Sequence, residues 1–277
     1  MPAVLLPRLK KQITELTWKF TRPNEFQSGL RELFSYYASR VYKPGKATPS
    51  SRLVDSYHVP PLVMRQLEQE ITPFVIENPE AALNIASVLW TEDMLEPRQL
   101  TAIILGIVPS SLSERVIQLL QSWCRTDVEG VSLQALLERG GQRLRHEKPD
   151  LWLSVVADWL SSSDALTQAM GVRALLTFVN DRDFVNLPAI FNLTGRPLQS
   201  SASAVQAEMY ELITALSKRS AAETAYFLRQ VLSGGANPAT IRVIRKALPN
   251  LPVSVQGPLR SALFNLPTIP LPPKEEM

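Results

Sequence analysis

The sequence of 277 residues contains a single cysteine, Cys124, and only two histidines, His58 and His146. One cysteine rules out an intrachain disulfide, which fits a protein of a reducing cytoplasm. So few thiol and imidazole groups also exclude a Cys/His zinc site, because such sites take four ligands at short spacings. We therefore expect a cytoplasmic protein with neither a disulfide nor a bound metal.

Long apolar runs and cofactor motifs are also missing. No stretch approaches about 18 uninterrupted apolar residues, and the N-terminus lacks an apolar segment of signal-peptide length, so we expect no membrane span and no secretion signal. The sequence has no phosphate-binding glycine-rich loop, serine nucleophile elbow or His/Glu metal motif, which argues against a cofactor. The net charge of +3 is small, so any nucleic-acid surface has to be local.

Apolar residues recur at helical spacing along most of the chain. Leu30, Leu33, Phe34 and Tyr37 fall at positions i, i+3, i+4 and i+7, which places them on one face of a helix. Many short helices of this kind predict an all-α fold, a HEAT-like or armadillo-type α-solenoid of antiparallel helix pairs, with a compact bundle as the structural alternative. Similar stripes run through residues 116–123, 152–159 and 205–216.

Proline-containing breaks separate these predicted helices. At 78–79 and again at 237–238, Asn precedes Pro, which places a capping residue before a proline at the first helical position. The stretch 43–61 is rich in proline and reads as a loop. The predicted organisation is N-terminal helices and a loop at 1–56, a HEAT-like repeat solenoid at 57–266 and a disordered tail at 267–277.

Four segments occur in the order found in one protein family. The four are His58–Arg65 with its Val-Pro-Pro, Leu89–Ala102 with Leu-Trp, Glu-Pro-Arg and Leu-Thr-Ala, the Asp-Trp at 158–159, and Arg242–Leu248. Together they resemble the DNA alkylation repair family of HEAT-like repeat proteins over roughly 57–263, and the second segment is the most specific of them.

The resemblance implies a superhelix whose basic concave face holds duplex DNA. Enzymes of this family remove cationic N3- or N7-alkylated purines with two tryptophans and an aspartate, and they use no metal or cofactor. A carboxylate suits this chemistry because it can stabilise the cationic sugar and position water, while indole faces attract the cationic base. Trp123 and Asp127 have the family's spacing and are the predicted catalytic residues. The structural alternative is core packing for Trp123 and turn capping for Asp127.

Two features depart from the family pattern. The helix expected directly after the aspartate begins near Val131, and alignment on that helix moves the aspartate position to Ser132 and the tryptophan position to Val128. No tryptophan or arginine occurs at 165–170, near which the family has its second tryptophan and a basic pair. The catalytic set is therefore incomplete, which favours a divergent member with altered or lost glycosylase activity.

Basic residues gather in two parts of the chain. From Lys218 to Arg260 there are seven basic residues and one acid, so this stretch carries a charge of +6, and an earlier cluster lies at 139–148. Clustered Lys and Arg can bind phosphates without reading base sequence, although the same charges can simply be solvated helix faces. The predicted DNA contacts are Arg139, Arg143, Arg145, Lys148, Lys218, Arg219, Arg242, Arg245 and Lys246.

The sequence leaves two functions open. The first is duplex DNA binding related to DNA alkylation repair, with or without alkylpurine-DNA glycosylase activity. The second is a non-catalytic HEAT-repeat scaffold that binds a protein partner. Basic side chains that line one groove would favour DNA, whereas scattered charges beside an open apolar groove would favour a protein. Nothing in the sequence predicts the lesion or the oligomeric state.

Overall fold

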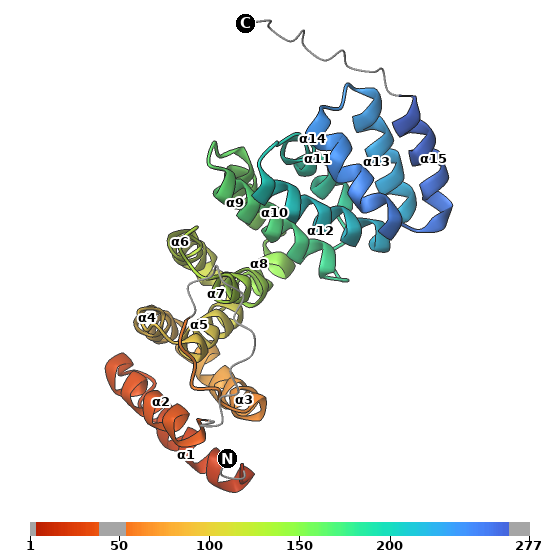
Figure 1. Ribbon diagram of the computed structural model, residues 1–277. Helices are drawn as coiled ribbons and strands as arrows, with labels where there is room; N and C mark the ends of the chain where they lie inside the picture. Colours follow the sequence, from red (N-terminus) through yellow and green to blue (C-terminus); the bar gives the residue numbers. More distant parts are fainter. Residues whose placement is uncertain (1–3, 39–53, 266–277) are drawn as a thin grey trace, which may run out of the picture. The chain divides into compact units, whose positions relative to one another are not determined.

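The structure, a computed structural model, describes residues 4–38 and 54–265. Across these residues helices are joined by short turns, and β-structure is limited to one isolated bridge between Asp55 and Met94. This confirms the all-α class predicted from the apolar spacing. The chain divides into two compact units, Met1–Val155 and Val156–Met277, with the boundary inside a helix (Figure 1).

The first unit consists of helix pairs. Proline stands at the first or second position of α1 to α4, where its fixed φ favours a helix and its missing N–H has no intrahelical partner to lose. The elements are α1 (Leu6–Thr17), α2 (Pro23–Tyr37), α3 (Pro61–Glu77), α4 (Pro79–Trp90), α5 (Leu95–Ile107), the 3₁₀ turn η1 (Ser110–Leu112), α6 (Ser113–Trp123), α7 (Gly130–Ala135), the π-helical turn η2 (Leu136–Gly140), α8 (Gln142–Glu147) and the start of α9 (Pro149–Ser161).

These helices form two layers. In one layer α1 packs on α3, α3 on α5, and α5 on α7, η2 and α8. In the other layer α2 packs on α4, and α6 follows α4 (Figure 1). Trp90 at the end of α4 stacks on Trp123 at the end of α6. The layers are joined through apolar faces, as in α2, where the predicted stripe from Leu30 to Tyr37 is buried. Helices α1 and α2, which belong to the predicted N-terminal helices and loop at 1–56, pack on α3 and α4 of this unit.

The segment from α7 to α8 is interrupted by a π-helical turn that packs on α5. Gly106 of α5 lies so close to it that a Cβ atom at this position would be 2.1 Å from the Arg139 carbonyl oxygen. Arg145 is only 8% exposed, and its guanidinium donates to the carbonyls of Leu137 and Glu138 at 2.8 and 2.7 Å. Arg145 therefore satisfies main-chain acceptors of the irregular turn.

The second unit repeats the two-layer plan. In one layer α10 packs on α12 and α12 on α14, while in the other α13 packs on α15; α11 and α13 both contact α12, which is the central helix. The predicted apolar stripe of α12, from Val205 to Leu216, is buried. The elements are the end of α9, α10 (Ala165–Asn180), α11 (Leu187–Leu198), α12 (Ser203–Arg219), α13 (Ala221–Ser233), α14 (Pro238–Ala247), the 3₁₀ turn η3 (Leu248–Asn250) and α15 (Val253–Phe264).

The two Asn-Pro breaks do start helices, but they do so differently. Asn237 caps α14, because its side-chain oxygen accepts the N–H of Thr240 at 2.8 Å. Asn78 makes no side-chain cap; its own N–H instead bonds the Phe74 carbonyl and closes α3, so this residue joins two helices through its main chain. The predicted tail at 267–277 lies outside the described residues.

Helix length and hydropathy also bear on membrane insertion. No single helix of the described residues is both long and apolar enough to cross a bilayer. Helix α5 and the η1–α6 segment pass that test only as a pair, which is bent by 104° at its break. Eight of the thirteen residues of α5 are buried, so its apolar side chains form part of the core of the first unit.

Candidate functional site

Trp123, the first predicted catalytic residue, is the last residue of α6 and stacks on another indole. Its ring lies 5.2 Å from that of Trp90, the last residue of α4, at an interplanar angle of 19°. The guanidinium of Arg98, from α5, lies over the Trp90 ring at 5.3 Å. Both indoles are half-buried, so the pair fixes two helix ends while keeping part of its surface accessible.

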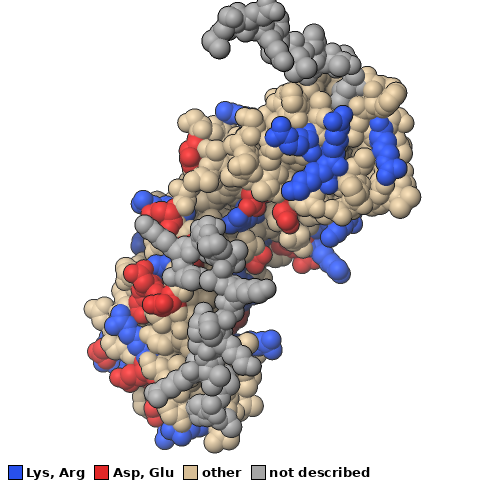
Figure 2. Space-filling model, in the orientation of Figure 1, with Lys and Arg blue, Asp and Glu red and all other residues tan. Residues whose placement is uncertain are grey.

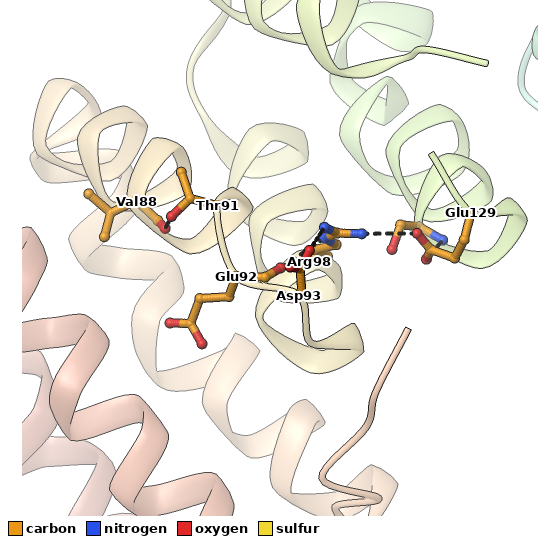
Figure 3. A network of polar contacts seen from close by, with 7 residues as sticks. Val88, Thr91, Glu92, Asp93, Arg98 and Glu129 are labelled. Carbon is orange, nitrogen blue, oxygen red and sulfur yellow. Dashed lines mark hydrogen bonds and ion pairs between the residues drawn. The ribbon is translucent and has the colours of Figure 1, made fainter. Parts of the chain in front are cut away.

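Arg98 links the turn after α4 with the start of α7 (Figure 3). Its Nε donates to the Glu92 carbonyl at 2.9 Å, its Nη2 to Asp93 at 2.8 Å and its Nη1 to Glu129 at 3.1 Å. The other carboxylate oxygen of Glu129 accepts the N–H of Ser132 at 2.7 Å and caps α7. The side chains of Arg98 and Glu129 are 14% and 6% exposed, so they form a largely desolvated ion pair.

Asp127, the second predicted catalytic residue, lies in the turn between α6 and α7. Helix α6 ends at Trp123, so the two predicted catalytic residues do not share a helix face. The Asp127 side chain is 59% exposed and pairs with Arg125 at 3.1 Å. Cys124 between them is buried, which raises the pKa of its thiol to about 12 and keeps it from acting as a nucleophile at neutral pH.

A cleft of about 520 Å³ lies beside Asp127. Four of its lining residues are acids and one is Arg98, so the cleft carries a negative potential that attracts cations and opposes the approach of a phosphate backbone. The residues that line it are Val54, Asp55, Asp93, Arg98, Asp127, Val128 and Glu129.

The alternative alignment of the catalytic motif offers no carboxylate. Ser132 is fully buried in α7, and within residues 4–38 and 54–265 its hydroxyl has no hydrogen-bond partner. Val128 is a half-buried lining residue of the acidic cleft. The stretch 165–170, near which the family pattern places its second tryptophan, forms the start of α10, and its Gln168 amide donates to the Leu160 carbonyl.

The first cluster of predicted DNA contacts is divided among three environments. Arg139 pairs with Glu68 across to α3, and Arg143 pairs with Glu147 at 2.7 Å. Arg145 is the buried residue that bonds the π-helical turn, so its guanidinium is occupied by main-chain carbonyls. Lys148 is exposed between α8 and α9.

The first cluster and the tryptophan pair lie at opposite ends of α5. Arg98 stands in the first turn of this helix, whereas Arg143 donates to the carbonyl of Ile107, its last residue. At a rise of 1.5 Å per residue these two ends are about 14 Å apart. The structure therefore does not bring Asp127 together with Arg143 in one cleft.

The second cluster lies on α12 and α14. Arg242, Arg245 and Lys246 occupy positions i, i+3 and i+4 of α14 and are exposed, and we call these three residues the α14 basic face. Lys246 also lies over the ring of Tyr210 of α12 at 4.7 Å. Figure 2 shows Lys and Arg side chains gathered over this part of the second unit.

Two further members of the second cluster sit at the end of α12. Lys218 is exposed there, in the last turn of the helix. Arg219 turns back onto the end of α10 and the loop after it, and donates to the carbonyls of Val179 and Arg182 at 3.0 Å. Arg219 thus holds a loop in place, as Arg145 does in the first unit.

Sequence reasoning gave no role to Arg98 or Glu129. Arg98 belongs to the Glu-Pro-Arg segment quoted for the family resemblance, and Glu129 precedes the helix that begins at Gly130, a position where acids often cap. Their pairing joins residues 31 positions apart. Only the packing of α5 against α7 brings them together, so no local pattern could predict it.

Comparison with known protein families gives one match. Residues 59–251 match the family model described as DNA alkylation repair enzyme. This stretch runs from just before α3 to just before α15 and includes more than half of the chain. No curated protein and no solved structure matches the chain.

Proposed function

The chain belongs to the DNA alkylation repair family, and we propose that it acts in DNA repair by binding duplex DNA through the α14 basic face. The observation that carries this proposal is the charge of that face. Arg242, Arg245 and Lys246 are exposed on two adjacent turns of one helix. Among the residues that the structure describes, no carboxylate lies within ion-pair distance of any of the three.

Phosphate contacts explain why such a face suits duplex DNA. Three cations at i, i+3 and i+4 can each neutralise a backbone phosphate and release its counterions, with no base being read. Lys218 at the end of α12 adds a further exposed cation to the same unit. Arg139, Arg143 and Lys148 supply a second, weaker set, because two of these three are already paired with carboxylates.

The test is fluorescence anisotropy of a labelled duplex over a series of salt concentrations. The triple variant Arg242→Gln, Arg245→Gln, Lys246→Gln should bind more weakly, and its slope of log K against log salt should be smaller by about 2 to 3.

A matched control is the triple variant Lys10→Gln, Lys11→Gln, Arg65→Gln. It removes the same charge from exposed positions of α1 and α3. If this control lowers affinity and slope as much as the α14 triple variant does, net charge rather than the α14 basic face drives binding, and the proposal fails.

We propose base excision at the acidic cleft as a second candidate activity. The observation that favours it is that Asp127 lies in a cleft of negative potential beside Arg98, whose guanidinium covers one tryptophan of the stacked pair. A cationic alkylated purine extruded from the duplex would be attracted there, while the phosphate backbone would stay outside the cleft. In the reaction the C1′–N bond breaks and its electron pair leaves with the purine, which becomes neutral. Asp127 stabilises the sugar cation that remains. Water then adds to C1′ and releases a proton to the solvent.

Release of N7-methylguanine from methylated duplex tests this activity. Asp127→Asn should slow release by about 100-fold, whereas Asp150→Asn, at an exposed position of α9, should leave the rate unchanged. If the wild-type protein releases no more base than spontaneous depurination does, the excision activity is ruled out and duplex binding remains to be judged by the salt series.

A protein-binding scaffold is the alternative from another class. In the described part of the chain the exposed large apolar side chains are spread from Leu5 to Phe264, and the clefts beside Asp127 and Arg143 are lined mainly by polar and charged groups. Both features argue against an apolar partner surface, and the exposed cations of the α14 basic face favour DNA. A wild-type protein that does not bind duplex at low salt would reverse this preference. We also propose the cytoplasm as the location, which a single cysteine without a disulfide partner in the chain fits.

A further inference from the structure

A second cleft, of about 480 Å³, lies at the far end of α5 from the tryptophan pair. Its walls come from α3, α5, η2 and α8, and its polar side chains include Arg139, Gln142, Arg143, Glu68 and Glu147. Two guanidinium groups from separate elements therefore face one space. We call it the arginine cleft.

Both arginines of this cleft are already paired, but with partly exposed carboxylates. Arg139 bonds Glu68, with side-chain exposures of 44% and 33%, and Arg143 bonds Glu147, with exposures of 32% and 41%. Ion pairs at this level of exposure contribute little free energy, because water and salt compete for both charges. Hydrogen bonds from Arg143 and Ser110 lower the pKa of Glu147, so this carboxylate stays ionised near neutral pH.

The main chain around the two arginines is held firmly. Arg143 also donates to the carbonyl of Ile107, which satisfies an acceptor at the end of α5. The carbonyl of Arg139 packs directly on Gly106, where any side chain would collide with it. The main chain that carries the arginines is thus fixed, and their guanidiniums are held only by partly exposed ion pairs and, for Arg143, by the Ile107 carbonyl.

We propose that the arginine cleft binds a phosphate group, which displaces Glu68 and Glu147 from Arg139 and Arg143. A phosphate monoester carries close to two negative charges at neutral pH and can accept paired hydrogen bonds from both guanidiniums at once, whereas each carboxylate engages only one. The exchange leaves both glutamates in water, where they are already partly exposed.

The size of the cleft suggests what carries the phosphate. About 480 Å³ is within the range of small-molecule sites and exceeds the need of a bare ion. The phosphate can therefore belong to a free nucleotide or to the 5′ end of a DNA strand. The second source deepens the proposed DNA-repair function and rests on it, whereas the first does not.

Calorimetric titration with inorganic phosphate tests the exchange directly. Glu68→Gln with Glu147→Gln should bind phosphate about tenfold more tightly than the wild type, because two surface ion pairs no longer compete. Arg139→Gln should lower the affinity about tenfold, and it leaves the bond between Arg143 and Ile107 intact.

The matched control is Glu77→Gln with Glu114→Gln, two exposed acids of α3 and α6 that lie outside the cleft. If this pair tightens phosphate binding equally, the effect is one of net charge, and the proposal is overturned. It is also overturned if neither the wild type nor Glu68→Gln, Glu147→Gln binds phosphate.

Duplexes with and without a 5′-phosphate separate the two sources. If the wild type prefers the phosphorylated duplex and Arg139→Gln abolishes this preference, the site binds DNA ends. If the two duplexes bind equally, the site binds a free nucleotide. Either result requires that the protein binds inorganic phosphate. The α14 triple variant keeps the arginine cleft, so it should bind phosphate normally. If that variant binds phosphate while wild-type duplex binding is absent, the DNA proposal fails and the arginine cleft stands.

Discussion

Replacing Arg98 by Met should lower the free energy of unfolding of the first unit by about 3 kcal/mol. The substitution keeps much of the side-chain volume but leaves the 6% exposed Glu129 without its counter-charge. Breaking a buried pair by removing one partner costs about 3–5 kcal/mol. The lower end applies here because Glu129 still accepts the N–H of Ser132, and because the bond to Asp93, 96% exposed, adds little.

Urea denaturation followed by tryptophan fluorescence measures this loss. The stacked Trp90 and Trp123 lie in the first unit and report on it, since Arg98 itself covers Trp90. Adding Glu129→Gln to Arg98→Met should restore about 1–2 kcal/mol, because the uncompensated charge is then removed. The midpoint should shift while the slope m stays unchanged.

Arg115→Met is the matched control for this experiment. Arg115 pairs with Glu80 at 3.7 Å, and both side chains are more than half exposed, so the loss should stay within about 0.5 kcal/mol. Should Arg98→Met cost no more than Arg115→Met, or should Glu129→Gln fail to restore stability, the buried pair does not hold the α4–α5 turn to α7 and the reasoning is refuted.

Three further outcomes follow from single positions. Gly106→Ala should destabilise the first unit by about 2–3 kcal/mol, because the new Cβ atom would meet the Arg139 carbonyl. Gly195→Ala in α11 should instead stabilise the protein by about 0.5–1 kcal/mol, because its Cβ atom would meet nothing within 4 Å. Equal urea midpoints for the two variants would contradict this. Burial raises the pKa of the Cys124 thiol from 9.0 in the unfolded chain to about 12 in the folded protein, so the unfolded chain ionises first. The free energy of unfolding should therefore be unaffected by this group below about pH 9 and should fall as pH rises towards 12, by about 2 kcal/mol at pH 10.5. In thermal unfolding, Cys124→Ala should show a smaller loss of stability over this pH range. Asp127→Asn should change stability by less than about 0.5 kcal/mol, because its ion pair is exposed; a larger loss would show that its effect on excision is structural.

Much of the fold was predictable from apolar spacing. The stripe from Leu30 to Tyr37 and the one from Val205 to Leu216 are buried, because residues three and four apart share one face of a helix whatever that face packs against. The cap at Asn237 was equally local. The cap expected at Asn78 did not form, because that residue closes the preceding helix as well as starting the next one.

The candidate site was less predictable. Asp127 was expected in a turn and lies in one, but its cleft takes walls from residues as far apart as Val54 and Glu129. The sequence identifies the basic residues of the chain but does not distinguish buried from exposed ones. Arg145 and Arg219 bond main-chain carbonyls, whereas Arg242 is exposed.

The sequence by itself determined the helices, the family and the basic character of the C-terminal stretch, because each of these depends on residue types at short spacings. Tertiary packing alone decided that Arg98 meets Glu129, that Arg139 and Arg143 share one cleft, and that Asp127 and Arg143 lie at opposite ends of α5. The physical reason is that such contacts join residues from different helices, and their distances depend on how those helices pack rather than on any pattern within one of them.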